Sequence, residues 1–390
     1  MTDKPLQGMR VIDLTHVLSG PYCTYQLGML GAEVIKIESP KGDMVRRWGG
    51  DRTQLKLGLG SGFVSQNAGK RSVVADIKTE RGRQLVRDLV KTADIFVENF
   101  RPGTMAKHNL GYETLSEINP ALIYLSISAF GQQGPEGHRP GFDDVIQATS
   151  GFMSINVRGD GPIRTGGPVL DFATGMHATS AVLAAVLLRQ QHGQGQRIDI
   201  AMQDVTLLLI NRHASITASS GTPPEPGSNR DAPLLGRYKT KEGYVMLAAY
   251  LPQHQRSILK ALGLQELAEL PSAELQARLP QIDLTVETTL MQKTATQWDK
   301  VFSEKAVVAG GVQDLGEVIA TQQTAYRELL TQVQTAAGPQ QVTTAGYRIN
   351  GEVFGPENSM ATLGEHTEQF LTELGYSEQE IARHLSPEPS

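Results

Sequence analysis

The chain has 390 residues, a formal charge of −5 at pH 7 and a hydrophobic fraction of 39%. This length exceeds what one hydrophobic core usually serves, so we expect two domains. The slightly acidic net charge gives no excess of basic residues for binding nucleic acid or an anionic membrane, which argues against a function that depends on such binding.

Targeting signals and cysteine usage both favour the cytoplasm. The first residues, Met1 to Leu6, lack the basic start and apolar run of a signal peptide, and no uninterrupted apolar run reaches about 18 residues. Cys23 is the one cysteine, so neither an intrachain disulfide nor a cysteine-based zinc cluster can form. We expect a cytoplasmic protein with no membrane partner.

A βαβ unit is predicted at the start of the chain. Apolar strands at 9–14 and 32–38 flank a helix at 22–30, which follows Gly20-Pro21 and ends at Gly31. Two parallel strands joined in this way place the intervening loop at the carboxyl edge of the sheet, where open α/β folds bind ligands. That loop lacks the G-x-G-x-x-G pattern of dinucleotide sites, which argues against hydride transfer.

Strands and helices keep alternating as far as residue 128. Further strands are predicted at 72–76, 93–100 and 122–128, and helices at 79–92, 102–108 and 112–119. The last strand is apolar on both faces, as a buried parallel strand should be. This alternation predicts an α/β fold with a doubly wound parallel sheet.

The second half of the chain predicts a smaller α+β domain. After turns around a short helix, we expect a helix at 176–189, a strand at 196–201 and a long helix at 203–218. A proline-rich stretch then precedes a predicted hairpin at 235–248 and helices from 253 to 331. We place the domains as follows: 1–222 large domain, 223–234 linker, 235–335 small domain, and 336–390 a return segment that completes the large domain.

Asp171 stands out between a glycine- and proline-containing turn and the helix predicted at 176–189. The positive end of a helix dipole stabilises an ionised carboxylate ahead of the helix, and such a group can act as a nucleophile. Asp is also a common N-cap, although Thr174 is a competent cap that stands closer to the helix. From this segment alone, a structural cap and a catalytic carboxylate both remain open.

Several common kinds of site are absent from the sequence. The nine histidines are scattered, with no H-E-x-x-H, and neither a G-x-S-x-G elbow nor a P-loop occurs. We therefore expect no metal cofactor. Cationic residues cluster at 36–47, 70–71 and 101–107, on loops that a doubly wound sheet would gather at one edge. The phosphates of coenzyme A (CoA) or of a sugar nucleotide would fit such a cluster equally well.

Ordered blocks along the whole chain carry a family resemblance. They lie at 6–14, 20–21, 30–38, 67–72, 97–103, 141–143 with Gln147, 166–177, 195–204 and 364–367. Together these blocks resemble the family III CoA-transferases, the CaiB/BaiF type. The resemblance implies a Rossmann-like large domain built from both chain ends, a smaller inserted domain, and two chains interlocked as a homodimer.

The resemblance also implies a site and a chemistry. Asp171 matches the family's catalytic carboxylate, which would attack an acyl-CoA thioester and form an aspartyl anhydride and then an aspartyl-CoA thioester. No metal is needed. CoA would lie against the large domain, and its implied contacts are Val17, Leu18, Lys70, Arg71, Asn99, Phe100, Arg101 and Lys107.

Departures from related enzymes narrow the reaction. Racemases of the superfamily carry His where this chain has Phe142, and they need it as a base that exchanges an α-proton. His138 lies nearby and is expected to be a loop residue. We therefore predict CoA transfer to a free acid. The alternatives are a CoA-thioester isomerase or racemase (intramolecular CoA transfer or 2-methylacyl-CoA epimerisation) and a catalytically silent acyl-CoA-binding relative.

The acid pocket is expected to differ from that of formyl-CoA:oxalate enzymes. Leu18 stands where those enzymes carry Gln, and residues 247–252 replace their glycine-rich loop. A larger or more apolar acid than oxalate should therefore fit. Arg46, Arg47 and Arg139 are candidates to pair with the second carboxylate of a dicarboxylic acid.

Overall fold

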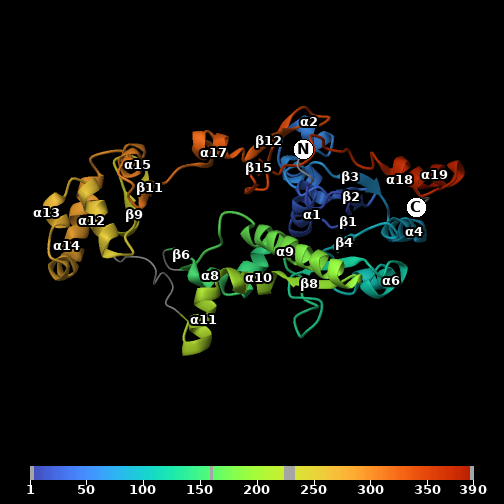
Figure 1. The fold of residues 1–390 in the computed structure, drawn as a ribbon, viewed down its shortest axis with the longest axis horizontal. Helices are drawn as coiled ribbons and strands as arrows, with labels where there is room; N and C mark the ends of the chain where they lie inside the picture. The colour runs from blue at the N-terminus through green and yellow to red at the C-terminus, as the bar shows by residue number, and fades with distance from the viewer. Residues whose placement is uncertain (1–3, 159–160, 224–232, 387–390) are drawn as a thin grey trace. The chain divides into compact units, whose positions relative to one another are not determined.

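The computed structural model describes residues 4–158, 161–223 and 233–386 (Figure 1). The chain divides into two compact units, Met1–Pro223 together with Ala325–Ser390, and Pro224–Thr324. Most of the linker predicted at 223–234 lies outside the described residues.

The large unit is built on a parallel sheet of six strands in the order β3-β2-β1-β4-β5-β8. This confirms the predicted α/β class and parallel sheet. The strands are β1 (Arg10–Leu14), β2 (Glu33–Glu38), β3 (Arg71–Val74), β4 (Ile95–Glu98), β5 (Ile123–Ser128) and β8 (Arg197–Ala201). From β1 the chain adds β2 and β3 on one side, and then returns to add β4, β5 and β8 on the other side. The crevice at the carboxyl ends of β1 and β4 is therefore the switch point, where such folds bind ligands.

Helices cover both faces of this sheet because successive strand residues point to opposite sides. Val11 of β1 packs with α1 (Ser19–Met29) and α9 (Val169–His192) in one core. The next residue, Ile12, packs in a second core with α4 (Glu80–Val90), α6 (Tyr112–Ile118) and α18 (Thr367–Glu373).

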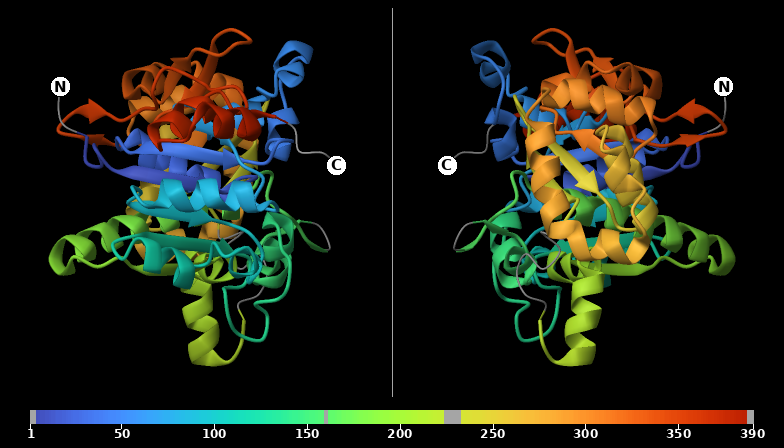
Figure 2. Two further views of the ribbon diagram at one scale, coloured as in Figure 1. Left: turned by 90° about the vertical axis from the view of Figure 1, so that its right-hand side faces the viewer. Right: turned by 90° about the vertical axis from the view of Figure 1, so that its left-hand side faces the viewer.

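The C-terminal return segment completes the large unit beside the edge strand β3. Ser72 N donates to His366 Nδ1 at 3.2 Å, and Val74 N donates to Thr367 Oγ1 at 3.0 Å. Figures 1 and 2 show the red C-terminal helices, α18 and α19 (Glu378–Leu385), beside the blue strands. Both ends of the chain thus contribute to one unit.

Helix α9 starts earlier than predicted, and residues in its middle are buried in the core of the large unit. It begins at Val169, so Asp171 lies within its first turn rather than ahead of it. By length and composition α9 could cross a membrane, but in this unit Ala178 and Val182 are buried in the core. The predicted long helix at 203–218 is two helices, α10 (Met202–Leu209) and α11 (Asn211–Ser220).

The second unit contains an antiparallel sheet in the order β11-β10-β9. The predicted hairpin is present as β9 (Leu235–Lys239) and β10 (Tyr244–Ala248), and β11 is Ala309–Gly311. The core of this second unit combines strand residues such as Val245 with Trp298 of the helix α15 (Ala295–Glu304). The remaining long helices are α12 (Pro252–Ala261) and α14 (Ser272–Leu290).

Gly175 allows α9 to approach the start of α1 closely. A methyl group placed on Gly175 would lie 2.7 Å from the carbonyl oxygen of Ser19 and 3.2 Å from the backbone nitrogen of Cys23. Such contacts are shorter than packing permits, so only glycine fits without a shift of one helix. The close crossing sets the position of Asp171, one turn earlier on α9, relative to α1.

We expect Gly175→Ala to destabilise the protein by about 1–3 kcal/mol, because the two helices must separate to admit the methyl group. Urea unfolding measures this change. Gly161→Ala is the matched control, because a methyl group there meets no atom within 4 Å. Equal stability of the two variants would contradict the tight crossing.

Candidate active site

The loop after β1 lies at the switch point and is clamped by a side chain from the end of β4. The backbone N–H of His16 donates to Asn99 Oδ1 at 2.9 Å, and Asn99 Nδ2 donates to the carbonyl of His16 at 2.8 Å. This reciprocal pair fixes the loop against the next strand. The His16 ring also packs against Phe100, with ring centroids 4.8 Å apart.

Val17 has a backbone conformation that β-branched residues rarely adopt, with φ of 67°. Two further side chains hold it there. Its N–H donates to Asp43 Oδ2 at 3.1 Å, and its carbonyl accepts from Gln66 Nε2 at 2.9 Å. Backbone strain of this kind persists only where the surroundings over-determine it, and it concentrates at functional sites.

The first turn of α9 is capped from another helix, which corrects both predicted caps. The backbone N–H groups of Leu170 and Asp171 donate to Asp143 Oδ2 at 2.7 and 3.1 Å. Asp143 opens α7 (Asp143–Thr149) and also accepts a hydrogen bond from Gln147. Thr174 caps nothing, because its hydroxyl donates to the carbonyl of Leu170 at 2.6 Å. The Asp171 side chain is thus not the cap of its own helix.

Asp171 lines a small cavity of about 70 Å³ at the carboxyl edge of the sheet. Its walls come from the β1–α1 loop, the ends of β4 and β5, and the starts of α7, α9 and α10. They are His16, Val17, Leu18, Ser19, Asn99, Ile127, Ser128, Ala129, Gly141, Phe142, Asp171 and Met202. None of these described lining residues is Lys or Arg.

The environment raises the pKa of Asp171 to about 7. Burial is the largest cause, the nearby Asp143 carboxylate adds to it, and hydrogen bonding from Ser19 opposes it. Burial therefore outweighs the stabilisation that a helix dipole gives the ionised carboxylate. Near neutral pH, both the acid and the carboxylate forms are populated.

A second cavity, of about 380 Å³, adjoins the first because His16 lines both. It extends over the carboxyl ends of β1, β2 and β3, with Phe100, Thr104 and His108 on the side of β4. Thr104 belongs to the short helix α5 (Thr104–Lys107). This cavity has the place and size of a site for the larger part of a ligand whose reactive end meets Asp171.

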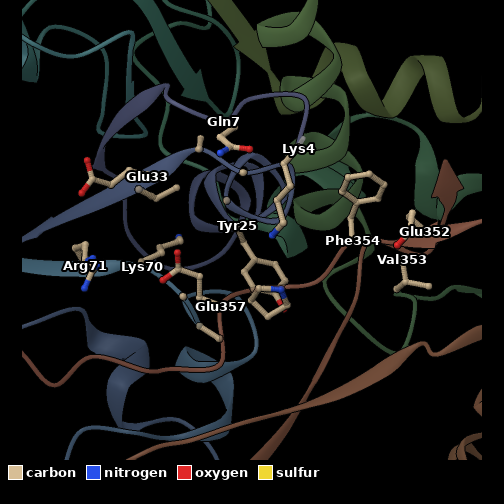
Figure 3. Close-up of a pocket in the computed structure, with 17 residues that line it drawn as sticks. Lys4, Gln7, Tyr25, Glu33, Lys70, Arg71, Glu352, Val353, Phe354 and Glu357 are labelled. Atoms are coloured by element: carbon tan, nitrogen blue, oxygen red, sulfur yellow. The ribbon is translucent and has the colours of Figure 1, made fainter. Parts of the chain in front are cut away.

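Lys70 and Arg71 lie apart from Asp171, in a third cavity of about 970 Å³ between α1, β2 and the return segment. Figure 3 shows both residues with Tyr25, Glu352 and Glu357 around this space. The Asp171 cavity and this one share no lining residue. The structure thus does not gather the predicted CoA contacts in one place.

Lys70 is also fully engaged inside the protein. Its buried ammonium donates to Asp13 Oδ2 at 2.9 Å, to Thr24 Oγ1 at 2.8 Å, to Asn67 Oδ1 at 2.8 Å and to the carbonyl of Pro21 at 2.9 Å. An ammonium has three N–H donors, so no donor remains for a phosphate.

The other predicted contacts divide between the cavities and the surface. Val17, Leu18 and Asn99 line the Asp171 cavity, and Phe100 lines the adjoining one. Arg101 and Lys107 are exposed and line none of the three cavities.

The three arginines proposed for a second carboxylate have different surroundings. Arg46 is buried and its guanidinium binds both oxygens of Glu38, at 2.7 and 2.6 Å, so an acid would have to displace this ion pair. Arg139 is exposed and pairs with Glu136. Arg47 is exposed and forms no ion pair with the described residues.

The sequence did not reveal the roles of three residues of the site: Ser19, Ser128, and Asp143 as the cap of α9. Asp143 lies within the recognised block 141–143, but its partner on α9 is distant in sequence, so no local pattern reveals the cap. Ser19 and Ser128 carry no signal beyond their positions, Ser19 at the start of α1 after the β1 loop and Ser128 as the last residue of β5.

Comparisons with known proteins agree on one family. A family model described as CoA-transferase family III matches residues 6–367. The chain is 35% identical to the succinate–glutarate CoA-transferase of Agrobacterium fabrum, over 95% of this chain and 96% of that enzyme. It is also 35% identical to the succinyl-CoA:mesaconate CoA-transferase of Haloarcula hispanica, with the same coverage. A solved CaiB/BaiF family protein from Brucella suis is 30% identical with a TM-score of 0.84, covering 96% of this chain and all of that one.

The saturated bonds of Lys70 make it a stability residue. We expect Lys70→Met to lower the free energy of unfolding by about 3–5 kcal/mol, because it leaves the Asp13 carboxylate buried without its partner. Denaturant unfolding measures the loss, and Lys107→Ala, at an exposed lysine, is the control expected to change little. Wild-type stability with weakened CoA binding in Lys70→Met would instead support the original phosphate role.

Proposed function

We propose that this chain, which belongs to CoA-transferase family III, moves CoA from an acyl-CoA thioester to a free carboxylic acid through covalent catalysis by Asp171. The family predicted from the sequence is confirmed, and the chain is an enzyme of the CoA-transferase class. The observation that carries the mechanism is the place of Asp171, a half-buried carboxyl in a small cavity at the switch point.

The proposed reaction begins when the ionised Asp171 attacks the thioester carbonyl. The carbon–sulfur bond breaks, giving an acyl-aspartyl anhydride and CoA thiolate. The thiolate then attacks the aspartyl carbonyl, which forms aspartyl-CoA and releases the donor acid as its carboxylate. The acceptor carboxylate repeats both steps in reverse, leaving as the new acyl-CoA and restoring Asp171.

The start of α1 supports this chemistry electrostatically. Ser19 is the first residue of α1, and hydrogen bonding from its side chain and backbone stabilises the Asp171 carboxylate. The first turn of α1 carries no acidic side chain to offset its positive end. Backbone N–H groups at a helix start stabilise negative charge that develops during acyl transfer.

CoA would extend from Asp171 into the adjoining cavity of about 380 Å³. His16 lines both cavities, and Phe100 lines the larger one. The exposed Arg101 follows Phe100 directly in the chain, and the exposed Lys107 ends α5, whose Thr104 also lines the larger cavity. These two cations, rather than Lys70, would then meet the phosphates. Exposed surface cations bind phosphates weakly in water, which suits a ligand that must leave after each turnover.

The acceptor we propose is a dicarboxylic acid. The relatives named for succinate, glutarate and mesaconate support this class. Since Arg46 is engaged with Glu38 and the described walls of the Asp171 cavity hold no Lys or Arg, the second carboxylate would reach beyond that cavity. Arg47 is the candidate of the original three whose charge is not paired with a described residue.

Phe142 supports transfer over α-proton exchange. It lines the Asp171 cavity, and its side chain is 66% exposed. A phenyl ring offers no base for the second proton transfer that a racemase requires.

We also propose a cytoplasmic, interlocked homodimer. Exposed apolar side chains on α9 and α10 support a surface covered by a second copy, and they include Leu187, Leu208 and Leu209, which are 60%, 57% and 50% exposed. Analytical ultracentrifugation tests the dimer, and a monomer at micromolar concentration would contradict it.

The central experiment supplies succinyl-CoA with a panel of carboxylic acids and measures new CoA thioesters by chromatography. We expect Asp171→Ala to lose at least about 10³-fold in kcat, since the covalent route is removed. Hydroxylamine should trap a hydroxamate on Asp171 in the wild type, located by mass spectrometry. Asp144→Ala, at an exposed carboxylate nearby, is the control. Full transfer by Asp171→Ala would refute the proposal.

The pH dependence follows from the raised pKa of Asp171. Because the nucleophile is the carboxylate and its pKa is about 7, kcat/KM should fall as pH drops through about 7 and level off above it. Asp143→Asn keeps a capping oxygen but removes a neighbouring negative charge, so the midpoint should move to lower pH. Steady-state kinetics between about pH 5.5 and 8.5 measure both profiles. An unmoved midpoint in Asp143→Asn would argue against this electrostatic coupling.

A further inference from the structure

The strand β5 ends with a hydroxyl that has no structural task. Ser128 is buried, with 9% of its surface exposed, and its Oγ has no hydrogen-bond partner in the described part of the chain. An unpaired buried hydroxyl destabilises a fold, so its presence requires an explanation outside the folded chain itself.

Ser128 lines the same cavity as Asp171, and its Oγ is covered by the wall, with less than 1 Å² accessible. The hydroxyl's immediate neighbours in the wall, Ile127, Ala129 and Met202, have no polar side chain that reaches it. Two other polar side chains in the wall are engaged elsewhere, since Asn99 holds the backbone of His16 and Ser19 stabilises Asp171, while the His16 ring packs against Phe100. The Ser128 hydroxyl therefore has an uncommitted donor, which a rotation about its Cα–Cβ bond would turn toward a group in the cavity.

The size of the cavity limits what that can be. About 70 Å³ corresponds to roughly two water molecules, or one carboxyl or thioester group. An acyl carbon that bonds to Asp171 brings its carbonyl oxygen into this space with it. In so small a volume, that oxygen lies close to the walls, which include Ser128.

We propose that Ser128 is a catalytic residue whose hydroxyl donates a hydrogen bond to the reacting carbonyl oxygen of the acyl group. The inference rests on the proposed transfer reaction and deepens it. The hydroxyl keeps its proton throughout, and no bond to Ser128 forms or breaks. Its hydrogen bond strengthens as the carbonyl oxygen gains negative charge during attack by Asp171 or by the CoA thiolate, so it favours the transition state over the bound substrate.

The test uses two alanine variants with opposite expectations for activity. Ser128→Ala should lower kcat about tenfold or more while leaving the KM for acyl-CoA nearly unchanged, because the bond forms fully only during the reaction. The control is Ser150→Ala, since Ser150 is also a buried hydroxyl without a partner among the described residues but lies outside the Asp171 cavity. It should keep wild-type kcat.

Thermal unfolding separates this role from a structural one. Neither variant loses a hydrogen bond within the protein, so both should melt at the wild-type temperature or slightly above it. Ser128→Cys, which keeps a weak donor, should recover part of the lost kcat. Equal kcat in Ser128→Ala and Ser150→Ala, or a loss of kcat matched by a melting temperature several degrees lower in Ser128→Ala, would overturn the inference.

Asp171→Ala, measured alongside, distinguishes a failure of the Ser128 role from a failure of the transfer mechanism. An inactive Asp171→Ala with a fully active Ser128→Ala refutes the role of Ser128 and leaves the transfer mechanism standing. An active Asp171→Ala, or a wild type that transfers no CoA to any acid, refutes the transfer mechanism and this inference with it.

Discussion

A buried network of charges under the carboxyl ends of β1 and β2 is the interaction on which the site depends. Asp13 binds Lys70, Asp43 lies 3.6 Å from Lys36, and Glu38 binds Arg46, all with little exposure to solvent. Removing one partner would leave a buried charge without compensation, so loss of any one of these groups should strongly destabilise the fold. The same groups hold the neighbouring backbone, since Lys36 Nζ donates to the carbonyl of Thr15 at 2.9 Å and Asp43 accepts from Val17. The strained loop that walls the Asp171 cavity therefore rests directly on these ion pairs.

The second constraint is the way Asp171 is carried to that loop. Its helix is long, is anchored in the core along its middle, and crosses α1 at Gly175 with no room for a side chain. Asp143 binds the first turn from outside, so the helix start is fixed without using Asp171 as its cap. The backbone at Asp171 is thus fixed by other groups, and its carboxyl, stabilised by Ser19, is not used to cap its own helix, an arrangement that positions a nucleophile.

Local features of the sequence were sufficient for the fold and insufficient for the site. Apolar runs and glycine or proline boundaries predicted the strands β1 to β5, because burial on both faces of a parallel sheet leaves a strong composition signal. The start of α9 was misjudged because its first turn contains Pro168 as cap and an exposed Val169, with no apolar repeat to announce it. Lys70 resembled a phosphate ligand because its partner Asp13 lies far away in sequence, and no spacing rule links them. The cap of α9 by Asp143 escaped prediction for the same reason.

The return of the chain to β3 has a consequence for how the protein is made. β3 is the edge of the sheet, and the backbone groups of Ser72 and Val74 are bonded by His366 and Thr367. During synthesis the strands β1 to β5 emerge early, while His366 and Thr367, which cover this edge, follow β5 (Ile123–Ser128) only much later in the chain. An uncovered edge strand can pair with other chains, so the nascent protein carries an aggregation hazard until residues 366 and 367 have been made. Truncation near the C-terminus would therefore damage solubility before it touched the chemistry of Asp171.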